Sequence, residues 1–162
     1  MTSDLELLLA DAQEMPHQLF ERLALSILTH LYAAGLMLPW HADIIAASDG
    51  PDAWEHRDPT LNPGHERWMG LWRANYERLA AYLGDRDRYF EVMDPDSSRS
   101  VTATLSDDLA GILADLMAGA ILCDESRVSE GVWEWRFRFS HWGAHAISAI
   151  KVLHARIDWD AP

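Results

Sequence analysis

Apolar residues recur at steps of three and four along four long segments of the chain, which is the spacing of one face of an α-helix. Residues that favour helix ends flank these segments: Pro16 suits a first turn, Pro39 a stop and Gly84 a C-cap. Ser106 or Thr104 can cap the start of the third segment. The pattern predicts long helices at about Pro16–Leu38, Gly64–Leu83, Ser106–Asp124 and Ser129–Ile157, and a short amphipathic helix at about Leu5–Ala12.

Strand signals are weak elsewhere. The stretch Arg88–Met93 alternates loosely, but one short strand would have no partner, so we expect an extended segment packed across the helices. The sequence thus predicts an all-α protein, an antiparallel four-helix bundle forming a single domain over residues 1–162. A long connection, Pro39–Pro63, joins the first two long helices. It can be a lid or binding loop, or a surface excursion with a short helix near Ala42–Ala47.

The charge of the chain narrows the classes of partner. Among 162 residues, 26 Asp and Glu oppose 13 Lys and Arg, which gives a net charge of −13. Nucleic acids and anionic membranes bind basic surfaces, so neither is expected as a partner, whereas a basic protein is. No apolar run reaches the length of a membrane span, and the first residues lack the features of a signal peptide, so we expect a cytoplasmic protein.

Two residue types change the picture further. The single cysteine, Cys123, allows no intramolecular disulfide, and no neighbouring base activates it as a nucleophile. His30 lies beside the apolar stripe of the first long helix and is expected to be a satisfied core histidine. The eight tryptophans are more than a core of this size can bury completely. Some are expected to line a groove or an interface, with burial in the core as the alternative.

One group of polar residues has chemical potential. Glu134, His141 and His145 fall within a narrow arc of the fourth predicted helix, beside its apolar stripe. The spacing of the two histidines, i and i+4, allows one helical face to present both imidazoles to one metal ion. Asp108 and Asp115 lie beside the apolar stripe of the third predicted helix. If these helices are antiparallel neighbours, the aspartates face the histidines.

Two interpretations of this group remain open. In the first it is a buried structural network without a cofactor, in which Glu134 pairs with Arg138, and an aspartate accepts from Arg136 or from a histidine. In the second it binds a divalent metal ion, and the ligands or their supporting residues are Asp108, Asp115, Glu134, His141 and His145. The Glu-x-x-His pairs of di-iron bundles are absent from these helices, so the sequence favours the structural network.

Several short motifs occur together in the order found in one family. They are Leu31-Tyr32-Ala33-Ala34, Leu38-Pro39, Tyr89-Phe90-Glu91-Val92, Asp94-Pro95, Leu105-Ser106-Asp107-Asp108-Leu109-Ala110, Trp133-Glu134-Trp135-Arg136-Phe137, and His141-Trp142-Gly143 with His145. In these motifs the chain resembles the bacterial family called domain of unknown function 5063. The resemblance implies an all-helical bacterial protein and brings no activity with it. The long Pro39–Pro63 connection and the absence of lysine around the third predicted helix depart from the family pattern.

The sequence therefore favours a non-enzymatic interaction module of the adaptor or immunity-protein kind. It would use its acidic surface and exposed tryptophans against a basic partner, because charge steers encounter and tryptophan is enriched at binding hot spots. The alternative is a metal-dependent helical-bundle protein or enzyme that uses the carboxylate and histidine group as a site. No catalytic residue is assigned, and the oligomeric state stays open.

Overall fold

A computed structural model describes residues 2–39, 63–92 and 99–157 of the chain. The side chains that the sequence suggested for a binding loop between Pro39 and Pro63 lie outside these residues. In chain order the elements are α1 (Thr2–Asp11), the short 3-10 helix η1 (Ala12–Glu14), α2 (His17–Leu36), α4 (Pro63–Leu83), the 3-10 helix η3 (Gly84–Arg86), β1 (Arg88–Val92), β2 (Ser100–Thr104), α5 (Leu105–Asp124), α6 (Val128–Phe137) and α7 (Phe139–Arg156).

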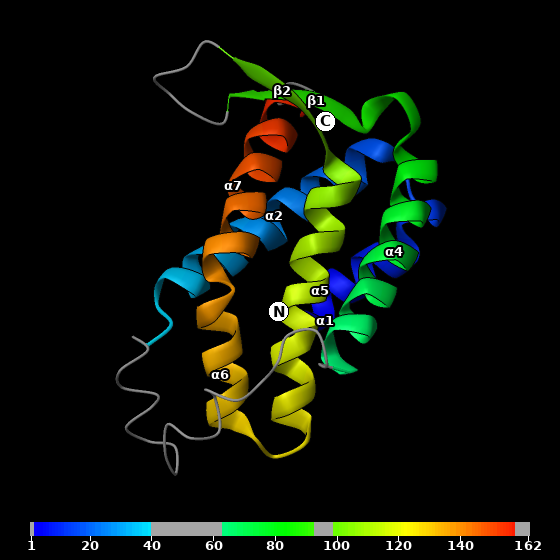
Figure 1. The fold of residues 1–162 in the computed structure, drawn as a ribbon. Coiled ribbons are helices and arrows are strands. Elements are labelled where there is room, and N and C mark those ends of the chain that lie inside the picture. The colour runs from blue at the N-terminus through cyan, green and yellow to red at the C-terminus, as the bar shows by residue number, and fades with distance from the viewer. Residues whose placement is uncertain (1, 40–62, 93–98, 158–162) are drawn as a thin grey trace.

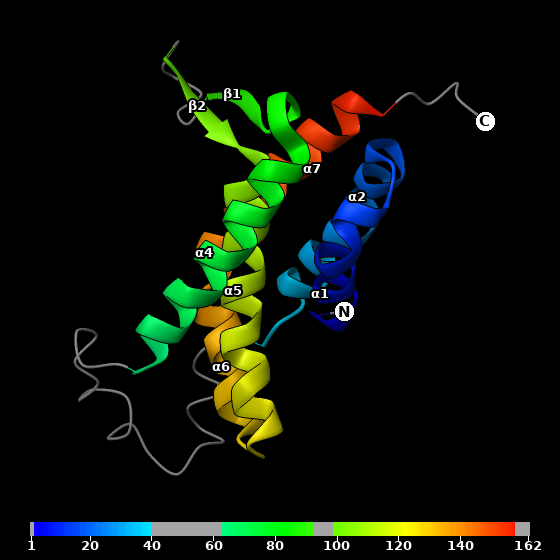
Figure 2. The same cartoon turned by 90° about the vertical axis from the view of Figure 1, so that its right-hand side faces the viewer.

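Helix α5 is the centre of the fold and contacts α1, α4, α6 and α7 (Figure 1). Helix α2 packs against α7 and α1 instead, and α1 and α2 form a layer behind α5 that is seen at the right of Figure 2. The core between these helices contains Phe20, Leu28, Leu79, Leu109 and Trp142, all buried. The protein is therefore mostly helical, as predicted, but the expected four-helix bundle is not confirmed.

The predicted second long helix ends where its sequence indicates. Helix α4 stops at Leu83, and Gly84 follows with φ of 54°, a left-handed conformation that glycine adopts without steric cost. No helix of the described residues is long and apolar enough to cross a membrane.

The expectation of an unpaired extended segment was wrong. Strand β1 pairs antiparallel with β2, with Tyr89 opposite Ala103. The partner strand, 100–104, was missed because it is short and mostly exposed, so only its β-branched residues indicate a strand. The hairpin leads directly into α5, where Thr104 is the N-cap and its side chain accepts from the backbone N–H of Asp107. The buried Asp87 holds this junction, since its carboxylate accepts from the N–H and hydroxyl of Ser106 at 2.7 and 2.8 Å.

The predicted helix Ser129–Ile157 is also two helices. Helix α6 ends at Phe137 and α7 begins at Phe139, with Arg138 between them at φ −82° and ψ −2°. The indole N–H of Trp142 donates to the carbonyl of Trp135 at 3.0 Å and so satisfies a group in the last turn of α6. The apolar period continues across the break without a proline or a glycine there, so the sequence pattern alone could not place it.

Candidate functional site

The N-terminal half of α5 carries three aspartates. Asp107 and Asp108 lie in its first turn, where the helix dipole favours negative charge, and Asp115 follows Asp108 by two turns. Asp115 is completely buried and Asp108 is 4% exposed, so both carboxylates depend on hydrogen bonds from the protein. These bonds come from three other elements: α4, the hairpin and α7 with the residue before it.

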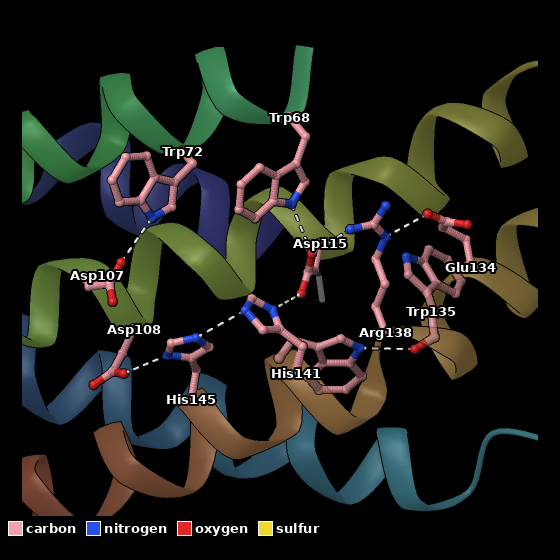
Figure 3. A network of polar contacts seen from close by, with 11 residues as sticks. Trp68, Trp72, Asp107, Asp108, Asp115, Glu134, Trp135, Arg138, His141 and His145 are labelled. Atoms are coloured by element: carbon pink, nitrogen blue, oxygen red, sulfur yellow. Dashed lines mark hydrogen bonds and ion pairs between the residues drawn. The ribbon is translucent and has the colours of Figure 1, made fainter. Parts of the chain in front are cut away.

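Each buried aspartate binds one histidine of α7 (Figure 3). Asp108 Oδ1 lies 2.7 Å from His145 Nδ1, and Asp115 Oδ2 lies 2.6 Å from His141 Nδ1. A carboxylate only accepts, so each Nδ1 carries the proton and donates. The Nε2 atoms of the two rings face each other at 3.3 Å. The prediction that α5 aspartates face α7 histidines is confirmed.

Asp115 is also the link to the remaining predicted site residue. Its Oδ1 accepts from Arg138 Nη1 at 3.1 Å and from the indole of Trp68 at 2.8 Å. Arg138 Nε donates to Glu134 at 2.5 Å, as predicted for a structural network. Glu134 thus reaches the histidines only through Arg138 and Asp115. Among the described residues, no group of three His, Cys, Asp or Glu side chains is arranged to hold a metal ion.

Three members of the network were not predicted from the sequence. Tyr89 of β1 donates its hydroxyl to Asp108 Oδ2 at 2.5 Å, and Trp72 donates its indole N–H to Asp107 at 3.0 Å. Trp72 and Trp68 had been assigned to the core face of their helix. The available signal was chemical, because a half-buried indole N–H requires an acceptor.

A cleft of about 280 Å³ adjoins the paired histidines between α4, α5 and α7. It is lined by Trp68, Met69, Trp72, Asp107, Gly111, His141 and His145. A Cβ atom at Gly111 would lie 3.6 Å from His145 Cδ2, so a larger side chain there would extend over the imidazoles. The expectation that some tryptophans line a groove is confirmed. The expectation of exposed tryptophans is wrong for the described residues, where every tryptophan is buried or half-buried.

Burial and hydrogen bonding change the acidity of these groups. Burial raises the pKa of Asp108, and the hydrogen bonds from His145 and Tyr89 act against that rise. The hydrogen bond to Asp108 raises the pKa of His145, although burial of the ring opposes it. Burial, and then the bond to Asp108, raise the pKa of the Tyr89 hydroxyl. Because both oxygens of Asp108 accept from donors, the geometry fits its ionised form, which holds His145 in one orientation.

The two weaker candidates do not belong to the site. His30 is exposed, and its Nδ1 pairs with the carbonyl of Ser26 at 2.7 Å, so the prediction of a core histidine was wrong. Cys123 lies at the other end of α5, and burial raises the pKa of its thiol, which keeps it in its unreactive form.

The match to a family model covers nearly the whole chain. Residues 7–157 match the model described as Domain of unknown function (DUF5063). The chain belongs to this family. All five predicted site residues of the DUF5063 domain fall within the matched range. Neither a curated protein nor a solved structure matches the chain significantly. The family description carries no activity, so the function of this DUF5063 protein has to be argued from its geometry.

Proposed function

We propose that this protein is a non-enzymatic binding protein and that its cleft takes a positively charged group of the ligand. The observation that carries the proposal is the excess of negative charge at the cleft wall. Asp107, Asp108, Asp115 and Glu134 contribute four carboxylates to the network, against which Arg138 supplies one permanent positive charge. Two fully protonated histidines would still leave the network negative. A cation is therefore the charge class that the cleft favours.

The aromatic wall favours the same class. Trp68 and Trp72 point their N–H groups at Asp115 and Asp107, which holds the indoles in place beside the cleft (Figure 3). An indole held in this way offers its π surface to a cation, an interaction worth about 0.5–2 kcal/mol depending on desolvation. The lining residues among those the structure describes include no serine, threonine, cysteine or lysine that could act as a nucleophile. This composition supports binding over nucleophilic catalysis.

Fluorine NMR of protein labelled with fluorotryptophan tests the proposal. The variants Trp68→Phe and Trp72→Phe assign the two cleft resonances, and the resonance of the buried Trp142 is the internal reference. The probes are agmatine, spermidine and Zn²⁺, and the dianion glutarate is the control. We expect at least one cation to shift the Trp68 and Trp72 resonances in a saturable way while glutarate shifts neither.

Two results would overturn the proposal. One is that none of the cations shifts the two resonances up to millimolar concentration. The other is that glutarate shifts them as strongly as the cations do, because the negative charge of the network would then not select the ligand.

A further inference from the structure

The orientation of the paired histidines is set by residues outside their own helix. Both Nδ1 atoms donate to aspartates of α5, so in the neutral imidazoles both Nε2 atoms carry lone pairs. The Nε2 atoms of His141 and His145 face each other at 3.3 Å (Figure 3). Two lone pairs at that distance repel, so the arrangement needs a positive centre between the nitrogens, which is either a shared proton or a metal ion.

The distance fits a metal ion of tetrahedral geometry. Two nitrogen ligands that each lie about 2.0–2.1 Å from a tetrahedral Zn²⁺ are about 3.3–3.4 Å apart. The supporting residues fit as well, because histidines that bind zinc generally donate their other ring nitrogen to a carboxylate or carbonyl. Asp108 and Asp115 make these bonds here, one to each ring.

We infer that His141 and His145 bind a divalent transition-metal ion of the zinc type between their Nε2 atoms, with Asp108 and Asp115 as positioning residues. The inference rests on the proposed cation-binding function and names the class of cation. Since no third side chain of the described residues completes a metal-binding group, the remaining coordination positions face the cleft and take water or a ligand atom. Such an open site resembles a catalytic or ligand-binding zinc centre more than a structural one. The His141 side chain is 51% exposed, so the ion can reach the site from solvent.

Metal titration of the full chain tests this inference. Protein stripped with a chelator is titrated with Zn²⁺ in a calorimeter and with Co²⁺ by visible absorption, which reports tetrahedral coordination. The variants are His141→Gln and His145→Gln, singly and together, and the matched control is His30→Gln on the exposed face of α2. We expect about one ion per chain, at least a tenfold loss of affinity in each single variant and no change in the control. Asp108→Asn is expected to weaken binding by about 10–100-fold, because it removes the charge that supports the ligand.

A second measurement uses the unaltered protein and does not depend on whether a variant folds. In proton–nitrogen spectra of the imidazoles, Zn²⁺ should shift the Nε2 resonances of His141 and His145 and leave that of His30 unchanged. The inference is overturned if one equivalent of Zn²⁺ leaves these resonances in place, or if the double variant binds Zn²⁺ and Co²⁺ as tightly as the parent. A shared proton then explains the distance. If agmatine or spermidine still binds the cleft, only the metal inference falls; if no cation binds, the proposed function falls with it.

Discussion

Helix α5 has two halves that make different kinds of contact. In its C-terminal half the backbones of α5 and α6 nearly touch, because Gly119 and Gly131 face each other: a Cβ added to either would lie 2.6–2.7 Å from the carbonyl oxygen of the other. In its N-terminal half, Asp108 and Asp115 face α7 through histidines, and a cleft remains beside them. Small residues fix the spacing of helices at one end, and hydrogen-bonded polar side chains hold the helices apart at the other. The candidate site lies in the half that is held apart.

Removal of Asp115 should have the largest effect on stability. Asp115 is fully buried and accepts from Trp68, Arg138 and His141, so Asp115→Ala leaves three donors without their acceptor. We expect a loss of about 3 kcal/mol in the free energy of unfolding, measured by urea denaturation. Asp124→Ala, at the exposed end of the same helix, is the control and should change stability by less than about 0.5 kcal/mol. Equal stability of the two variants would show that the network does not hold α4, α5 and α7 together.

The close-packed half should respond to a single methyl group. In Gly131→Ala the new Cβ would lie 2.4 Å from the sulfur of Cys123 and 2.6 Å from the carbonyl oxygen of Gly119. Relief requires the helices to move apart, which costs about 1–3 kcal/mol in stability. The matched control is Gly70→Ala on α4, where nothing lies within 4 Å of the added atom. This control should stabilise the protein by up to about 1 kcal/mol, because alanine favours the helix. If Gly131→Ala unfolds at the same urea concentration as the parent, the close approach of α5 and α6 is not a constraint on the fold.

The two halves also differ in how far the sequence predicts them. The helical period placed α5, and the spacing of Asp108, Asp115, His141 and His145 correctly indicated that the aspartates would meet the histidines, because both sets lie beside apolar stripes that pack together. The break at Arg138 could not be predicted, since it leaves the apolar period intact. Tertiary contact decides such features, and local pattern does not contain them.

The hairpin and the tryptophans illustrate the same limit. A short exposed strand such as β2 has little hydrophobic alternation, so its pairing with β1 follows from chain geometry more than from its residues. Trp68 and Trp72 have the spacing of a core stripe, and an indole at a core boundary looks the same in sequence as one inside it. Only the position of Asp107 and Asp115 on the neighbouring helix distinguishes them.

The smallest expected effect concerns the thiol of the close-packed half. Burial, reinforced by the neighbouring charge of Asp124, raises the pKa of Cys123, so less thiolate is present at each pH below the midpoint than in the unfolded chain. We expect iodoacetamide to alkylate Cys123 more slowly in the folded protein than in urea at every pH near neutrality, with a midpoint of the rate profile at higher pH. Mass spectrometry of quenched samples measures both rates. Gly70→Ala should leave the folded profile unchanged, whereas Gly131→Ala, by moving the helices apart around the sulfur, should bring it closer to that of the unfolded chain. A folded midpoint at or below the unfolded one would mean that water reaches this end of the α5–α6 contact, and the contrast between the two halves of α5 would then lie in chemistry alone and not in packing.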